Sequence, residues 1–248
     1  MTALGTPPGE PAPELSPAAA EQLFGTLAEQ LRGCGVVLDV GAGSGALGLA
    51  LAVRGLPVVL VDLVDRREGA AARLPFLAGD ATRLPIRSVS CGGVHLSRVL
   101  LHLVDWRAAL AEIARVLLPG GVLCLSLGWA RYQDVLRDLV GAVDQEAERR
   151  GLYREPVRAR MEGPDEVEQV LHRVGLDPLR TVTVTDEQWI TPRQAVADVV
   201  APGHRWLPGQ DLSVLPELGA TVLATSGLAP DQPLPQRRTV TYRLYRRR

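Results

Sequence analysis

The residues of this chain best suited to chemistry form a glycine-rich segment, Asp39-Val40-Gly41-Ala42-Gly43-Ser44-Gly45. It lies between an apolar run at 36–40 and a second apolar run at 46–51 that is typical of a helix. Glycine at such a junction lets the chain turn sharply and lets a ligand approach the backbone without obstruction by a Cβ atom. The spacing Gly41-x-Gly43-x-x-Ala46 also fits a loose dinucleotide fingerprint. The segment therefore predicts a nucleotide-type cofactor site, with a tight turn that binds no ligand as the alternative.

Acidic residues favour one class of cofactor over the other. Asp39 stands two residues before the first glycine, where it would repel a pyrophosphate and attract a cationic amino-acid group. S-adenosylmethionine carries such a group, because its sulfonium and ammonium are balanced by a single carboxylate. Asp80, in Gly79-Asp80-Ala81, can accept a hydrogen bond from an adenine amino group. The acids therefore favour S-adenosylmethionine over NAD, for which Asp62 lies at roughly the spacing of a ribose ligand.

Histidine is the side chain most often used for proton transfer near neutral pH. His102 follows the fourth predicted strand, where parallel sheets place their ligands, and is the candidate catalytic residue. An orienting or structural role for His102 stays open. His95 lies inside the same apolar strand and is expected to be a hydrogen-bonded core residue. A base is needed only if the methyl acceptor must lose a proton, because in-line transfer from a sulfonium depends mainly on positioning and exclusion of water.

These groups need strands that end at a common edge. Short apolar runs with little polar alternation, typical of strands buried on both faces, alternate with helical stretches. This alternation predicts a doubly wound α/β fold with a mostly parallel sheet covered by helices on both sides. Two later segments alternate with period two and complete seven strands. The predicted strands are 36–40, 58–61, 75–78, 93–97, 122–127, 181–185 and 239–244.

Helix and domain boundaries follow from proline, glycine and capping residues. Predicted helices begin at Ser16-Pro17, Asp105, Pro164 and Thr191-Pro192. We expect a disordered, proline-rich leader over 1–14 and a single domain over 15–248, including the N-terminal helix. The segment 191–235, rich in Pro and Gly, is a long connection near the C-terminus, which predicts an inserted lid or acceptor-binding element.

Composition excludes several classes of protein. The formal net charge of −1 indicates no nucleic-acid or membrane footprint at the level of the whole chain, although the arginine-rich end at 243–248 could contact RNA. The three cysteines, Cys34, Cys91 and Cys124, lack ligand or disulfide spacing, so we expect no metal site and a reducing compartment. Neither a signal peptide nor a membrane span is expected. A cytoplasmic protein with a small-molecule acceptor is predicted, with its oligomeric state open.

Four motifs in order resemble the class I S-adenosylmethionine-dependent methyltransferase superfamily, most closely its ubiquinone and menaquinone biosynthesis-like group. They occupy 37–45, 61–62, 79–85 and 113–121. The resemblance implies that the glycines approach the donor's amino-acid part and that Asp62 holds the ribose hydroxyls. It further places Asp80 and Ala81 beside adenine, and Ser97 beside the methyl group. The implied residues for binding S-adenosylmethionine are Asp39, Gly41, Ala42, Gly43, Gly45, Asp62, Leu63, Asp80, Ala81 and Ser97.

The chain departs from this family pattern in two places. The acidic residue that the family usually carries before the fourth strand is absent from Ser90-Cys91-Gly92-Gly93. We interpret this difference as drift at a packing position. The segment between Asp62 and Asp80 is also short for a full helix. The resemblance implies methyl transfer to a small molecule. The alternatives are an RNA or protein methyltransferase, a catalytically silent domain that binds nucleosides or partners, and a nicotinamide oxidoreductase.

Overall fold

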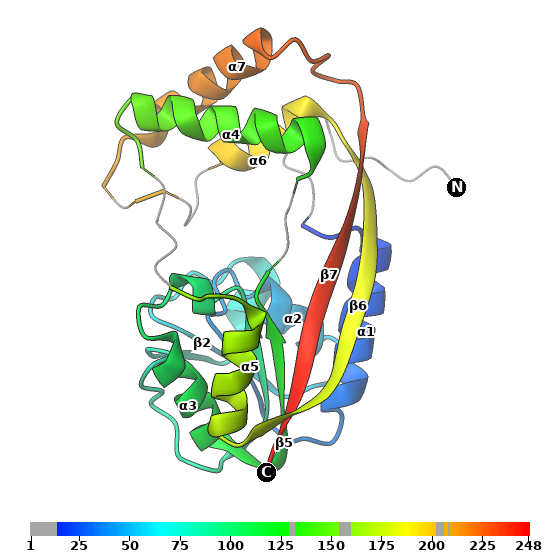
Figure 1. Ribbon diagram of the computed structural model, residues 1–248, viewed down its shortest axis with the longest axis vertical. Helices are drawn as coiled ribbons and strands as arrows, with labels where there is room; N and C mark the ends of the chain where they lie inside the picture. The colour runs from blue at the N-terminus through cyan, green and yellow to red at the C-terminus, as the bar shows by residue number, and fades with distance from the viewer. Residues whose placement is uncertain (1–13, 129–131, 154–159, 202–205, 208) are drawn as a thin grey trace. The chain divides into compact units, whose positions relative to one another are not determined.

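A computed structural model describes residues 14–128, 132–153, 160–201, 206–207 and 209–248 (Figure 1). Its strands form one seven-stranded sheet in the order β3-β2-β1-β4-β5-β7-β6. The first five pair in parallel, and β7 runs antiparallel to β5. The strands are β1 (Val37–Val40), β2 (Val58–Asp62), β3 (Phe76–Ala78), β4 (Cys91–Ser97), β5 (Leu117–Ser126), β6 (Leu176–Ile190) and β7 (Leu234–Arg247). The predicted mostly parallel, seven-stranded α/β class is confirmed.

Contacts between residues divide the chain into two compact units. Unit 1 comprises Met1–Ala19, Trp129–Pro156 and Thr185–Thr239, and unit 2 comprises Ala20–Gly128, Val157–Val184 and Val240–Arg248. Three of the five boundaries fall within the N-terminal helix, β6 and β7. The predicted domain layout, with a leader over 1–14 and one domain over 15–248, stays a prediction. All of that leader except Glu14 lies outside the described residues.

Helices cover both faces of the sheet in unit 2. Strand residues such as Val94 and Leu96 belong to a core with α3 (Trp106–Val116) and α5 (Pro164–Arg173), and these two helices pack together on one side (Figure 1). Alternation along β4 sends Gly93 and His95 to the opposite face. A Cβ built on Gly93 would lie 2.8 Å from Leu31 of α1 (Pro17–Leu31). The sheet is therefore doubly wound, as predicted.

Local signals explain where the helices of unit 2 begin. Asp105 caps α3, because its side chain accepts a hydrogen bond from the Ala108 N–H. Pro164 occupies the first turn of α5. Between β2 and β3 the chain forms only a short 3-10 helix, Gly69–Arg73, consistent with the prediction that this segment is too short for a full helix. The second helix of the unit, α2 (Ala46–Ala52), follows the glycine-rich segment directly.

Unit 1 contains three α-helices in its described part: α4 (Asp134–Arg149), α6 (Pro192–Val200) and α7 (Leu215–Thr225). All three contact one another. The predicted start of α6 is confirmed by a capping box in which Thr191 and Gln194 exchange hydrogen bonds. The helices α4 and α7 were not predicted. Their buried apolar residues form a core with α6 that includes Leu136, Leu139, Val143, Val196, Val199, Leu215 and Leu218.

No helix in the described part of the chain is long and apolar enough to cross a membrane. The segment predicted to be an inserted lid, 191–235, contains α6 and α7 and lies in unit 1. Its role as a lid or acceptor-binding element stays a prediction.

Candidate functional site

The glycine loop joins β1 to α2 in a conformation that requires glycine. Gly41 and Gly45 have φ angles of 73° and 79°, in the left-handed region that other residues rarely adopt. A Cβ on Gly41 would lie 2.2 Å from Val99, and one on Gly45 would lie 2.8 Å from Ala71. A Cβ on Gly43 would meet no atom within 4 Å. The loop is therefore packed tightly at both ends and open in the middle, where a ligand can approach its backbone.

The Asp62 carboxylate at the end of β2 holds this loop. Its Oδ2 accepts the Gly43 N–H at 2.8 Å, and its Oδ1 accepts the Leu63 N–H at 2.7 Å. The N–H groups of Gly41 and Ala42 donate to the Val61 carbonyl. A carboxylate has about four acceptor positions, so Asp62 keeps capacity to accept from a diol. Leu63 is exposed beside it.

The loop after β3 carries the next two predicted residues. Oδ1 of Asp80 accepts both the N–H and the hydroxyl hydrogen of Thr82, each at 2.8 Å, so the carboxylate shapes a turn. Ala81 is buried behind it. Because Asp62 and Ala78 are register partners in parallel strands, the loop bearing Asp80 lies at the same sheet edge as Asp62.

The carboxyl end of β4 contributes Ser97 and the turn after it. Ser97 is buried, and its hydroxyl interacts with the Tyr242 hydroxyl. Arg98 has a φ of 60°, a strained conformation for a long side chain of the kind that clusters at functional sites. His102 is an exposed residue at the end of the 3-10 turn Leu100–His102, whose first residue, Leu100, is buried. The structure places His102 at the predicted edge, and its role as a base stays a prediction.

Asp39 lies deeper than the other predicted residues and belongs to a buried chain of hydrogen bonds. Its Oδ1 is 2.8 Å from His95 Nδ1, and His95 Nε2 is 3.0 Å from the Tyr242 hydroxyl. The Asp39 side chain is only 3% exposed and that of His95 is fully buried. The prediction that His95 is a hydrogen-bonded core residue is confirmed. The other Asp39 oxygen, Oδ2, is buried without a partner among the described residues.

Elementary chemistry determines which groups donate and which accept in the hydrogen bonds that link Asp39, His95 and Tyr242. Burial raises the pKa of the Tyr242 hydroxyl well above its ordinary value, and the nearby Asp39 charge raises it further while Ser97 lowers it. Tyr242 therefore keeps its hydrogen at physiological pH. Because a carboxylate oxygen only accepts, His95 Nδ1 donates to Asp39 Oδ1, and Nε2 of the neutral imidazole accepts from the Tyr242 hydroxyl.

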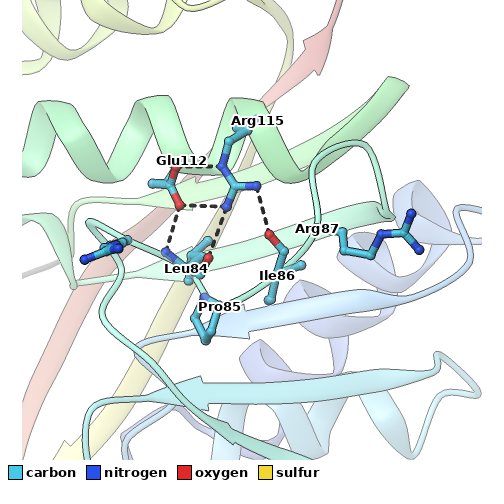
Figure 2. A pocket seen from close by; sticks show the side chains of 7 residues that line it. Leu84, Pro85, Ile86, Arg87, Glu112 and Arg115 are labelled. Atoms are coloured by element: carbon cyan, nitrogen blue, oxygen red, sulfur yellow. Dashed lines mark hydrogen bonds and ion pairs between the residues drawn. The ribbon is translucent and has the colours of Figure 1, made fainter.

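A pocket of about 500 Å³ lies against α3, beside the segment that follows Asp80. Figure 2 shows Glu112 and Arg115 of α3 pointing at the backbone of this segment. Glu112 accepts the Leu84 N–H at 2.8 Å, and the Arg115 guanidinium donates to the Leu84 and Ile86 carbonyls. The two side chains also bond each other at 2.7 Å. This clasp on α3 fixes the loop whose start carries Asp80 and Ala81.

Glu112→Gln is expected to destabilise the protein in a pH-dependent way. The hydrogen bond from Arg115, with help from the Leu84 N–H, holds the pKa of Glu112 below its ordinary value of 4.5. The carboxylate therefore stabilises the fold at neutral pH, and this contribution is lost as pH falls through the lowered pKa. We expect a deficit of about 1 kcal/mol near pH 7.

Thermal unfolding at about pH 7 and about pH 3 measures this effect. The deficit of Glu112→Gln should shrink at the lower pH, while Glu29→Gln, at an exposed position of α1, should change little at either. A deficit of equal size at both pH values would contradict the assignment.

Several functional contacts have no signature in a single stretch of sequence. The glycine loop is closed by Val99, which lies 58 positions after Gly41, and the clasp depends on side chains of α3. Tyr242 was not predicted to lie near Asp39. The sequence did carry a signal for two of the three hydrogen-bonded residues, because Asp39 and His95 are polar residues inside apolar strands. Their position as register partners emerges only from the pairing of β1 with β4.

Comparison with known proteins identifies similarity in the segment that carries the site. Residues 38–125 match the family model described as a methyltransferase domain. The uncharacterized methyltransferase Rv3342 of Mycobacterium tuberculosis is 35% identical over 179 residues, which cover 66% of this chain and 63% of that protein. The chain thus spans less than two thirds of that relative. The demethylmenaquinone methyltransferase of Mycolicibacterium gilvum is 41% identical over 94 residues, covering 37% of this chain and 41% of that protein.

Solved structures share the fold over most of the chain. A Bacillus halodurans protein provisionally assigned as a methyltransferase superposes with a TM-score of 0.55 and 18% identity, covering 90% of this chain and 96% of that one. Identity at this level shows the fold and leaves the chemistry to be argued from the site.

Proposed function

Because the chain belongs to the class I S-adenosylmethionine-dependent methyltransferase superfamily, we propose that it transfers a methyl group from S-adenosylmethionine to a small-molecule acceptor. The observation that carries the proposal is the Asp62 carboxylate bound to the open middle of the glycine loop. A carboxylate able to accept from hydroxyl groups thus lies next to a backbone that a ligand can approach, which supports a ribose contact. The cytoplasm is the proposed location, on the pattern of the cysteines.

The residues present suit this donor. The open position at Gly43 accommodates an amino-acid group against the loop, and the unused acceptor positions of Asp62 suit a ribose diol. Oδ2 of Asp80 makes no hydrogen bond within the described part of the chain and can accept from an adenine amino group. Leu63 presents an exposed apolar surface for a nucleobase. Asp39 supplies a negative charge near the loop, which complements a cationic donor.

The proposed chemistry is a displacement at carbon with a sulfide as leaving group, which the bound donor supplies. The part of this chain is to hold donor and acceptor in line and to exclude water. Ser97, buried at the end of β4, is the proposed neighbour of the methyl group. His102 is the proposed base for acceptors that must lose a proton, and its own exposure leaves it accessible to them.

The alternative functions have weaker support. An RNA methyltransferase would use the C-terminal arginines, but Arg243 pairs with Glu168, and Arg247 and Arg248 donate to backbone carbonyls. A catalytically silent domain was suggested only by the unusual segment Ser90-Cys91-Gly92-Gly93, which was predicted to precede the fourth strand and instead forms the start of β4. A Cβ on Gly92 would lie 1.5 Å from the Cys34 carbonyl oxygen, so packing explains that segment. We therefore retain a small-molecule acceptor as the proposed substrate class. The demethylmenaquinone methyltransferase relative makes quinone-like aromatics sensible first candidates for an acceptor screen.

Calorimetric titration tests the donor. Purified protein should bind S-adenosylmethionine and S-adenosylhomocysteine with dissociation constants in the micromolar range, about −8 kcal/mol, and should not bind NAD. Binding of NAD alone would favour an oxidoreductase. Binding of none of the three would contradict the proposed function and favour the interaction-domain alternative.

A further inference from the structure

We infer that His95 and Tyr242 are positioning residues of the donor site, which orient the Asp39 carboxylate at the base of the glycine loop. The inference rests on the proposed function and deepens it. Neither residue is expected to touch the donor or the acceptor. Their role is to fix the direction of the buried Asp39 carboxylate beneath the loop that is proposed to hold the donor's ammonium group.

The first support is the unequal environment of the two Asp39 oxygens. Oδ1 is bound to His95, while Oδ2 is buried without a partner among the described residues. A Cβ built on Gly48 would lie 2.6 Å from Oδ2. Since Gly48 is in the first turn of α2, the unpartnered oxygen lies against the turn that follows the glycine loop. The hydrogen bond from His95 is what holds the carboxylate in this direction.

The second support is that Tyr242 fixes the imidazole. Its hydroxyl bonds Nε2, and the two rings stack with centroids 5.4 Å apart and an interplanar angle of 22°. Both nitrogens of His95 are therefore used, and the ring cannot turn without breaking two hydrogen bonds. The hydrogen bonds thus run from Tyr242 of β7 through His95 of β4 to Asp39 of β1, at the start of the glycine-rich segment.

The third support is energetic. An acid and a histidine buried inside an apolar sheet are expensive to desolvate, and apolar residues of similar volume often stabilise a core as well or better. The rest of β1 is Val37, Leu38 and Val40, so the polar pair departs from the pattern that stability alone favours. Its position under the loop is explained if the carboxylate acts on a ligand there.

Two ligands distinguish a positioning role of His95 and Tyr242 in the donor site from a purely structural role in the core. S-adenosylhomocysteine carries the amino-acid part, and 5′-methylthioadenosine lacks it while keeping the nucleoside. If His95 acts through Asp39 on the amino-acid part, then His95→Leu should weaken S-adenosylhomocysteine about tenfold, or about 1.4 kcal/mol. Binding of 5′-methylthioadenosine should change less than about twofold. His95→Asn, which keeps a donor toward Asp39, should restore much of the lost affinity.

The experiment is calorimetry of wild type, His95→Leu, His95→Asn and Tyr242→Phe with both ligands. Tyr242→Phe removes one hydroxyl and is expected to weaken S-adenosylhomocysteine about threefold, which keeps the test valid if His95→Leu fails to fold. Val94→Ala is the matched control, because Val94 is the fully buried neighbour of His95 on the opposite face of β4. It should lower the melting temperature and leave the ratio of the two affinities unchanged.

The possible outcomes are distinct. A selective loss of S-adenosylhomocysteine in His95→Leu and Tyr242→Phe supports the inference. Equal losses for both ligands, or no loss in Tyr242→Phe and in any folded His95→Leu, overturn it while leaving the proposed function intact. Failure of the wild type to bind either ligand overturns the proposed function, and the inference with it.

Discussion

Asp62→Ala is expected to weaken binding of S-adenosylmethionine by about ten- to a hundredfold, or about 1.4 to 2.8 kcal/mol. The substitution removes the acceptor proposed for the ribose hydroxyls. It also leaves the N–H groups of Gly43 and Leu63 without the carboxylate that orders them. The first loss removes a contact from the bound state, and the second adds the cost of ordering the loop when the ligand binds. Calorimetric titration measures the change directly.

A nearby acid provides the control for charge. Asp65 lies three positions after Asp62 and pairs with Arg67, with its own side chain 48% exposed. Asp65→Ala removes the same charge from the same segment and should leave donor affinity within about twofold of wild type. If Asp62→Ala binds the donor as tightly as wild type, the ribose assignment is wrong. Equal weakening by both variants would indicate a general electrostatic effect instead.

The second large effect is on stability, at a buried ion pair in unit 1. Asp186 and Arg238 have side chains 0% and 4% exposed, with Arg238 Nε at 2.9 Å and Nη2 at 2.6 Å from Asp186 Oδ2. Asp186 also accepts the Ser16 N–H at 3.1 Å and a hydrogen bond from Gln188 at 3.0 Å. Arg238 donates to the Glu14 carbonyl as well. The pair therefore ties the start of the described chain to β6 and β7.

Asp186→Ala is expected to lower the free energy of unfolding by about 3 to 5 kcal/mol, because a buried guanidinium loses its carboxylate. Burial by itself would raise the pKa of Asp186, but the hydrogen bonds from Ser16, Gln188 and Arg238 outweigh it and hold the pKa below 3.8. The stabilising contribution is thus present at neutral pH and is lost as pH falls through this lowered pKa. Urea unfolding at neutral and acidic pH measures both the deficit and its disappearance.

An exposed ion pair in the same unit provides a control for the effect of burial on the loss of stability. Arg193 and Asp231 form two hydrogen bonds of 2.8 Å, with side chains 43% and 63% exposed. Because such pairs are solvated and screened, Asp231→Ala should cost less than about 1 kcal/mol. A deficit for Asp186→Ala no larger than that for Asp231→Ala would contradict the assigned role of burial.

Signals confined to a few neighbouring residues were predicted well from sequence. The helix starts at Asp105 and Thr191 are side-chain caps that act within three residues, so local chemistry determines them. The turn at the glycine loop is likewise local. The helices α4 and α7 were missed although α4 has a clear helical pattern, with Leu136, Leu139 and Val143 on its buried face. The sequence of α4 therefore contained the pattern needed to predict a helix, although the sequence analysis did not identify it.

The sequence by itself determined the class of fold, because the alternation of buried strands and amphipathic helices has few other compact solutions. It also determined the place of the glycine loop and of the acids within β1, at the end of β2 and after β3. The tertiary structure decided which groups those acids bind. Asp39 meets His95, 56 positions away, and His95 meets Tyr242 after a further 147. No local pattern encodes such contacts, because they form only when β4 pairs with β1 and β7 pairs with β5 in the folded sheet.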